Sequence, residues 1–351
     1  MAKLTPRQLK ILGYIQQNPW TSTHAVKEYL AKEGASASRI TVVRDIGHLV
    51  RAKLIQSKGK GRAVTYHDLA PTPLLRFIDV ESYFKKNVDE RPVRYSRFNG
   101  DVFRYLRQIF IPDEREDLSE LNKLYRQHVK KLSATAIKKE FERLTIELSW
   151  KSSRIEGNTY SLIDTEILLK QHQETAGHTK DEALMIINHK KALDYVANKK
   201  SDFKKITLRK IENIQRLIVE GLGVNHGIRK RPVRIIGTRH VPMDNPHQIR
   251  EGLEKTADII NQIADPFSKA LVGILMISYL QPFEDGNKRT ARLLGNAILL
   301  AHNACPLSYR SVNESDYKKA MILFYEQNTA LFFKQLFIEQ FRFAVNNYFL
   351  A

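Results

Sequence analysis

Residues 281–292 read Gln281-Pro282-Phe283-Glu284-Asp285-Gly286-Asn287-Lys288-Arg289-Thr290-Ala291-Arg292 and separate two apolar segments of helical character. Gly286 and Asn287 are predicted to open a helix, whose exposed N–H groups and dipole would form an anion site. Arg289 and Arg292 are three residues apart, so they share one helix face and could hold a polyphosphate with forked donors. Asp285 is a hard oxygen ligand beside that site, which suits a magnesium ion bridging phosphates.

This stretch resembles the motif of the Fic family, H-P-F-x-D-G-N-G-R-T-x-R, and departs from it at two positions. Members of that family are all-helical and mostly transfer AMP from ATP to a hydroxyl of a target protein. The resemblance implies ATP with Mg2+ as ligands, Asp285 as the metal-binding residue and Phe283 as the anchor of the loop in the core. The nucleotide-binding residues that it implies are Gly286, Asn287, Lys288, Arg289 and Arg292.

The two departures concern the chemistry. Gln281 stands where the family has its catalytic histidine, the general base that takes the proton from the target hydroxyl. A glutamine amide cannot accept that proton near neutrality, and general base catalysis contributes typically ~10²–10⁴-fold. Lys288 replaces the second glycine, as in the Doc branch of the family, whose members are kinases. The resemblance therefore leaves both AMP transfer and phosphoryl transfer open.

Upstream, residues 227–242 alternate β-branched side chains around a glycine, a pattern that predicts a β-hairpin. The hairpin resembles the Fic flap, which lies over the active site and positions a target segment by backbone pairing. The predicted flap residues are Val233, Ile235, Gly237 and His240. We expect His240 to be solvated, and the alternative is that it serves as a substitute base.

The segment around Glu156 ends a helix predicted over about 136–157, and Gly157 suits its C-terminal stop. From the residues alone, Glu156 is a surface helix charge. The segment also resembles the inhibitory motif of the Fic family, S/T-x-x-x-E-G/N, at Ser152, Glu156 and Gly157. In that family the glutamate pairs with the second arginine of the loop, here Arg292, and blocks the γ-phosphate position. With the base absent, Glu156 is either a relic or a stabiliser of the nucleotide-free fold.

Composition sets the broad class. The 351 residues carry a formal net charge of +19, which fits a polyanionic partner, nucleic acid first, or equally a Lys-rich solvated surface. The single cysteine, Cys305, excludes an internal disulfide, suits a reducing compartment and is expected to pack in the core. The N-terminus lacks the hydrophobic core of a signal peptide, and the longest apolar run, 270–280, is too short to span a bilayer. We expect a cytoplasmic protein with no membrane partner.

Residues 1–69 are predicted to form three helices and a basic-tipped hairpin. The third helix is expected to bury Val43, Ile46, Leu49 and Val50. The module resembles a winged helix-turn-helix, in which the third helix could enter a major groove while the wing tip contacts phosphate. Winged helices also dock proteins, but the excess of basic over acidic residues here favours DNA. The predicted DNA-binding residues are Arg39, Thr41, Arg44, His48, Lys58, Lys60 and Arg62.

Prolines open a linker or connecting segment, 70–117, and helical periodicity dominates the Fic domain, 118–351. The expected fold is therefore mainly α: a Fic-type helical domain with a β-hairpin flap, preceded by a small α+β winged-helix domain. A homodimer is left open.

Three functions are compatible with the sequence. We rank first a DNA-binding regulator whose Fic domain binds nucleotide but is catalytically weakened by Gln281. The second is an active protein adenylyltransferase, or a Doc-like phosphotransferase, auto-inhibited by Glu156. The third is an interaction protein whose flap grips a partner protein without nucleotide.

Overall fold

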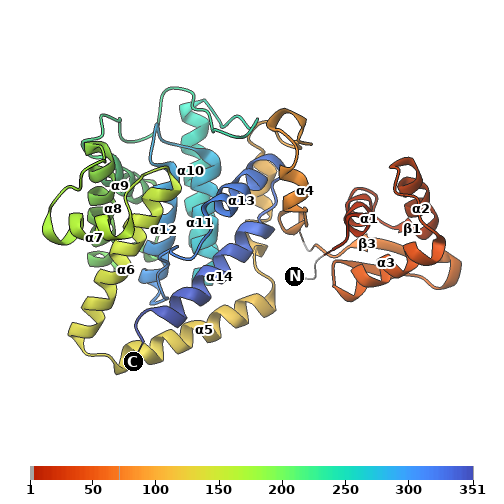
Figure 1. Cartoon of the computed structure of the whole chain (residues 1–351), viewed down its shortest axis with the longest axis horizontal. Coiled ribbons are helices and arrows are strands. Elements are labelled where there is room, and N and C mark those ends of the chain that lie inside the picture. The colour runs from red at the N-terminus through yellow and green to blue at the C-terminus, as the bar shows by residue number, and fades with distance from the viewer. Residues whose placement is uncertain (1–3, 71, 351) are drawn as a thin grey trace. The chain divides into compact units, whose positions relative to one another are not determined.

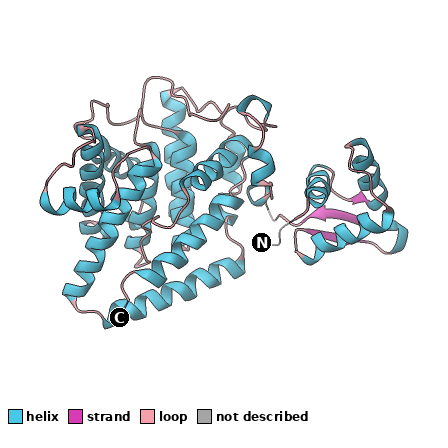
Figure 2. Cartoon of the chain, in the orientation of Figure 1, coloured by secondary structure: helices cyan, strands magenta, loops and turns pink. Residues whose placement is uncertain are grey.

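The computed structural model describes residues 4–70 and 72–350, apart from the side chain of Arg62. The chain forms two compact units, Met1–Arg91 and Pro92–Ala351, and the division falls within the predicted connecting segment. All strands of the described residues lie in the first unit, and the second unit is helical (Figures 1 and 2). The fold is mainly α with a small α+β first unit, as predicted. No helix of the described ranges is long and apolar enough to cross a bilayer.

Within its described residues, the first unit has four α-helices and a three-stranded antiparallel sheet in the order β1-β3-β2. Its elements are α1 (Pro6–Gln17), β1 (Thr21–Ser22), α2 (Thr23–Lys32), α3 (Arg39–Arg51), β2 (Ile55–Lys58), β3 (Thr65–Asp68) and α4 (Val80–Phe84). The side chain of Thr5 caps α1, and Pro6 occupies the first helical position, where a missing N–H costs nothing. A single core joins α1, α2, α3 and the sheet.

The helix α3 buries a different stripe from the one predicted. Its buried side chains are Val42, Asp45, Ile46 and Leu49. Val43 is 47% exposed, so its predicted burial is wrong, whereas Val50 is half-buried and packs against the core. The reason is Asp45, whose carboxylate accepts hydrogen bonds from Arg7 Nε at 2.6 Å and Gln8 Nε2 at 3.2 Å. This paired carboxylate at a core position interrupts the apolar pattern that the prediction followed.

The second unit is a bundle of long helices. They are α5 (Pro112–Lys131), α6 (Ala134–Ile155), α7 (Leu162–Gln171), α8 (Lys180–Asn198), α9 (Leu208–Val219), α10 (Pro246–Gln262), α11 (Pro266–Leu280), α12 (Asn287–Ala301), α13 (Glu314–Gln327) and α14 (Leu331–Asn347). Every residue of α11 from Phe267 to Leu280 is buried, and the helix packs against α10, α12 and α13 at the centre of the bundle (Figure 1). Cys305 is buried, as expected. The centre of the bundle thus holds both helices that flank the 281–292 loop.

The predicted hairpin flap is a turn without a β-ladder. In residues 227–245 the structure has no strand, and Val241 makes only an isolated parallel bridge. Several polar groups of the segment bond to other parts of the chain, and none pairs across a ladder within the segment. Val241 N–H donates to Ser96 O at 2.8 Å, and the Thr238 hydroxyl donates to Glu326 Oε1 at 2.6 Å. These contacts replace the cross-strand bonds that the alternating pattern predicted.

Candidate functional site

The shape of the loop 281–292 depends on two residues whose backbone has the left-handed conformation. Gln281 ends α11 with a φ of +45°, and Gly286 begins α12 with a φ of +79°. A Cβ atom at Gly286 would lie 2.9 Å from Ile218 Cγ2 and 3.1 Å from Val219 Cγ1. Because no real Cβ tolerates such contacts and L-residues avoid this φ, a glycine lets the first turn of α12 approach α9.

Asn287 shapes the loop from a position in the wall of the cavity described below. Its Oδ1 atom accepts from the N–H of Phe283, and its Nδ2 atom donates to the carbonyl of Phe283, each at 2.9 Å. The Phe283 ring itself is fully buried. The oxygen and the nitrogen of the Asn287 carboxamide therefore both hold the backbone of the loop, and its contact with nucleotide phosphates stays a prediction.

The two arginines are buried cations with unused donors. Arg289 is 2% exposed and Arg292 is fully buried. Arg289 Nη2 donates to Asp285 Oδ2 at 2.7 Å, and Arg292 donates to the hydroxyl and the carbonyl of Ser152 at 2.9 and 2.8 Å. In each guanidinium the buried Nη1 atom has no hydrogen-bond partner among the described residues. Such buried donors fit an anionic group.

Asp285 fits a magnesium ion held together with phosphates. Its side chain is 55% exposed beside Arg289. Magnesium usually takes one or two carboxylates plus phosphate oxygens rather than an all-protein cage. In keeping with this, the described residues contain no cluster of three or more metal-ligating side chains.

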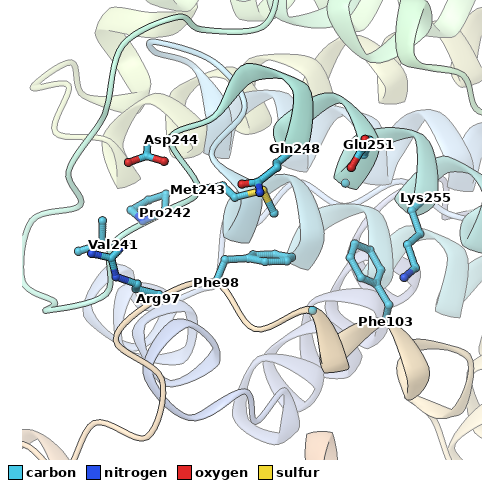
Figure 3. Close-up of a pocket in the computed structure, with 12 residues that line it drawn as sticks. Arg97, Phe98, Phe103, Val241, Pro242, Met243, Asp244, Gln248, Glu251 and Lys255 are labelled. Atoms are coloured by element: carbon cyan, nitrogen blue, oxygen red, sulfur yellow. The ribbon is translucent and has the colours of Figure 1, made fainter.

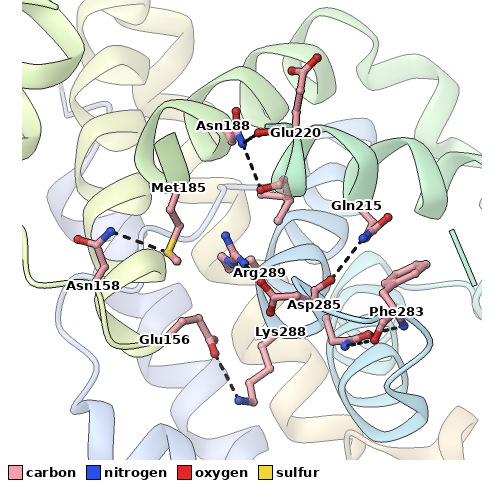
Figure 4. Close-up of polar contacts among 12 residues, drawn as sticks. Glu156, Asn158, Met185, Asn188, Gln215, Glu220, Phe283, Asp285, Lys288 and Arg289 are labelled. Atoms are coloured by element: carbon pink, nitrogen blue, oxygen red, sulfur yellow. Dashed lines mark hydrogen bonds and ion pairs between the residues drawn. The ribbon is translucent and has the colours of Figure 1, made fainter. Parts of the chain in front are cut away.

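Glu156 bridges two cations of the loop. Its Oε1 atom accepts from Arg292 Nη2 at 2.9 Å. Its Oε2 atom accepts from Lys288 Nζ at 3.3 Å (Figure 4). Burial alone would raise the pKa of Glu156, but the charges of Arg292 and Lys288 hold it below its ordinary value. Gly157 follows with a φ of +105° and turns the chain away from α6. The structure thus contains the contact between Glu156 and Arg292 that the resemblance implies, and adds Lys288 to it.

These groups surround a cavity of about 510 Å3. It is lined by the loop, the end of α6, the flap and α13, with Gln281, Asp285, Lys288, Arg289, Glu156, Val233, Ile235 and Gly237 in its wall. Gln281 is 7% exposed, and its Nε2 atom donates to Ser278 O at 2.6 Å. The residue at the position of the general base therefore faces the cavity with a carboxamide.

His240 is buried, whereas it was expected to be solvated. It is 1% exposed and stacks on Tyr279 and Tyr325, with centroid distances of 5.0 and 5.9 Å. Burial lowers its pKa to about 4. The expectation of a solvated flap histidine is therefore wrong. The alternative of a substitute base gains no support, because His240 is not among the residues that line the cavity.

Two features of the site were not predicted from the sequence. They are the residues that α13 adds to the cavity wall and the most exposed residue of the flap. Tyr317 lines the cavity, and the Arg292 guanidinium lies 5.3 Å from the centre of its ring. Ile236 is 97% exposed at the tip of the flap. The position of Tyr317 could not be read from the sequence, because α13 reaches the loop only through tertiary packing. Ile236 was visible as an apolar residue in the flap pattern.

A second cavity of about 470 Å3 lies beside the base of the flap (Figure 3). Phe98 and Phe103 form one wall, and Met243 and α10 form the other. Lys255 Nζ lies 4.6 Å from the ring centre of Phe103. No residue of this cavity was predicted from the sequence, since its walls come from segments far apart in the chain.

In the first unit, the predicted DNA-binding residues differ in exposure. Arg39, Arg44, Lys58 and Lys60 are exposed, whereas Thr41 and His48 are half-buried. The Thr41 hydroxyl lies 3.0 Å from that of Ser38, the residue that caps α3. The side chain of Arg62 lies outside the described part. Trp20, which the sequence analysis did not single out, is 47% exposed, and Lys58 Nζ lies 5.2 Å from its ring centre.

Comparison with known proteins shows what the second unit is similar to. The model of the Fic/DOC family matches residues 205–299. The protein adenylyltransferase Fic of Nematostella vectensis is 29% identical over 230 residues, which cover 60% of this chain and 52% of that protein. The protein of the same name in Aedes aegypti is 27% identical over 189 residues, covering 52% of this chain and 37% of that protein. The chain thus spans about half or less of the length of these relatives.

Solved structures agree on the fold. A fragment of Fic-1 from Caenorhabditis elegans has a TM-score of 0.56 and 19% identity, covering 67% of this chain and 70% of that one. A Fic domain-containing signaling protein from Bacteroides thetaiotaomicron has a TM-score of 0.56 and 19% identity, covering 66% and 94%. The predicted Fic-type helical fold is confirmed. Residues 205–299 are thus similar to the Fic/DOC family, and the second unit has the helical fold of these Fic structures.

Proposed function

We propose that the second unit binds a nucleoside triphosphate with Mg2+, ATP in the first place, and that Gln281 leaves it a weak transferase. The observation that carries this proposal is Gln281 in the wall of the cavity that also contains the buried cation Arg289. The amide can orient a hydroxyl but cannot accept its proton, so ligand binding and proton transfer are uncoupled. Glu156 would restrain the site by occupying Arg292, as the inhibitory glutamate does in the Fic family.

We also propose that the first unit binds DNA, which makes the whole chain a regulator. Four exposed cations support this proposal. They are Arg39 and Arg44 on α3, Lys58 at the end of β2 and Lys60 in the turn that follows. Phosphate contacts of this kind position a duplex without reading its sequence. Duplex affinity should fall steeply with salt, and absence of any binding at low salt would refute this part of the proposal.

The central experiment follows two labels. ATP labelled separately on the α- and γ-phosphates is incubated with wild type, Glu156→Gly, and Glu156→Gly combined with Gln281→His. Calorimetric titration with magnesium-ATP measures binding by the same proteins. We expect Glu156→Gly to bind ATP and transfer neither label, and the double variant to transfer the α label. Gln248→His in the second cavity, also combined with Glu156→Gly, controls for an added imidazole.

An active transferase is the second candidate, and the names of the relatives favour it. Transfer of the α label by Glu156→Gly alone would establish adenylyl transfer and refute the weakened site. Transfer of the γ label would instead identify a phosphotransferase. If no variant binds magnesium-ATP, the third candidate remains, an interaction protein whose flap grips a partner protein.

A further inference from the structure

The outward face of α3 carries large aliphatic side chains. Ile40 is 81% exposed and Val43 is 47% exposed. The two residues are three apart, so they lie on one helix face, opposite the buried stripe of Val42, Ile46 and Leu49. Neither side chain is needed for the core of the first unit. Neighbouring exposed aliphatics of this kind indicate a surface that contacts another molecule.

Gly47 continues the same face one turn further on. A Cβ atom added there would meet nothing within 4 Å. Glycine is less favourable than alanine inside a helix, and packing within the unit does not require it at this position. Because Gly47 has no side chain, the surface of α3 has a shallow depression there, at which the backbone of another molecule can approach closely.

The positive charges around the outward face of α3 favour a polyanion as its binding partner. Arg39, Arg44 and Arg51 are exposed along α3. The single acidic residue of the helix, Asp45, is 5% exposed and paired with Arg7, so it does not contribute to the outward face. An α-helix with its side chains is about 10–12 Å in diameter, which matches the width of about 12 Å of a DNA major groove. Charge and shape together favour duplex DNA over an acidic protein.

We propose that Ile40 and Val43 contact the 5-methyl groups of thymine in the major groove, so that the first unit prefers A·T-rich duplex. Thymine is the base that presents a methyl group in that groove, and aliphatic side chains are its natural contacts. The arginines on either side hold the phosphates and carry no sequence information. The inference rests on the DNA binding proposed above and adds the chemistry of the bound sequence.

The test removes only the methyl groups. Full-length protein is titrated onto a fluorescent duplex of alternating A·T, about two helical turns long, and onto the same duplex with uracil in place of thymine. The phosphate charge is identical in the two probes. Burying one methyl group multiplies an equilibrium constant by roughly four, so two contacts predict roughly fifteenfold tighter binding of the thymine duplex.

Variants assign the difference to α3. Ile40→Ala with Val43→Ala should bind both duplexes with the affinity that wild type has for the uracil duplex. Lys58→Ala with Lys60→Ala should weaken binding to both duplexes equally, and the ratio should persist. Ile163→Ala, which removes a 70% exposed isoleucine from the other unit, is the matched control and should change nothing.

The outcomes separate this inference from the DNA binding on which it rests. Equal, salt-sensitive affinity of wild type for the two duplexes overturns thymine recognition and leaves DNA binding intact. A thymine preference that survives Ile40→Ala with Val43→Ala also overturns it. Binding to neither duplex at low salt refutes both proposals, and the apolar face of α3 would then be a protein-docking surface.

Discussion

The ammonium of Lys288 lies 3.3 Å from Glu156 Oε2, so the residue that replaces the second glycine of the Fic motif contacts the inhibitory candidate. The other oxygen of this carboxylate is bound by Arg292. Glu156 is thus held from two sides, by a buried guanidinium and by a lysine that is 28% exposed. The two cations have different environments, and replacing each group separately should give different results.

Glu156→Gln should lower the unfolding free energy of the nucleotide-free protein and favour nucleotide binding. Arg292 is fully buried, and removal of one partner from a buried ion pair costs about 3–5 kcal/mol. The bonds to Ser152 remain, which places the expected loss in unfolding free energy near the lower end of that range. Thermal unfolding with and without magnesium-ATP is the measurement. ATP should raise the melting temperature of Glu156→Gln more than that of wild type, and equal shifts would contradict a restraining role for Glu156.

Lys288→Met should also lower the unfolding free energy and favour ATP binding, but by less than Glu156→Gln. The ion pair is partly exposed, and such pairs contribute about 0–1 kcal/mol. Arg292 still holds Glu156 in this variant, so we expect a change in unfolding free energy below about 1 kcal/mol and only a modest gain in ATP affinity. Lys318→Met, which removes another lysine from the cavity wall, is the matched control for lost positive charge. If both variants bind ATP alike, the contact of Lys288 with Glu156 has no part in regulation.

Gly286→Ala should destabilise the second unit. The new Cβ would lie 2.9 Å from Ile218 Cγ2, and the φ of +79° is unfavourable for alanine. Strain of this kind costs on the order of 1–3 kcal/mol. Gly13→Ala is the control, because Gly13 lies inside α1 with open space around it and should gain up to about 1 kcal/mol. Urea unfolding of both variants measures the difference, and a neutral Gly286→Ala would show that the loop can shift away from α9.

The helices and the loop were predictable because their signals are local. The apolar run of α11, the glycine at the start of α12 and the proline at the start of α10 are all visible in the sequence. Asn328, in a left-handed conformation, separates α13 from α14. Periodicity and capping are properties of neighbouring residues, so these elements need no knowledge of tertiary contacts.

The failures concern residues whose partners are distant in the chain. The exposure of Val43 depends on a buried carboxylate paired with α1, and the missing flap ladder depends on Ser96 and Glu326. The contact of Glu156 with Arg292 was implied by family resemblance and not by spacing. The contact of Glu156 with Lys288 is not visible in the motif, because 132 residues separate the two in the chain. Partners of this kind become visible only when the helices are packed.

His240 provides a pH test of the buried environment that the sequence did not reveal. Its pKa of about 4 lies below the value of about 6.5 in an unfolded chain, because burial between aromatic rings disfavours the cation. The folded state therefore binds fewer protons than the unfolded state between these two values. The stabilising contribution is complete above about pH 6.5 and is lost as the pH falls towards about 4.

His240→Phe should remove this dependence while keeping the stacking on Tyr279 and Tyr325. One titrating group changes the unfolding free energy by up to about 1.4 kcal/mol per pH unit. The variant should be less stable than wild type at pH 7.5, since it loses the polar contact with Tyr95 O, and the gap should narrow or reverse by pH 5. His189, also buried with a lowered pKa, contributes equally to both proteins and cancels in the difference. Exposed His247→Phe is the control. A gap that stays constant from pH 7.5 to 5 would mean that His240 titrates normally and is open to solvent.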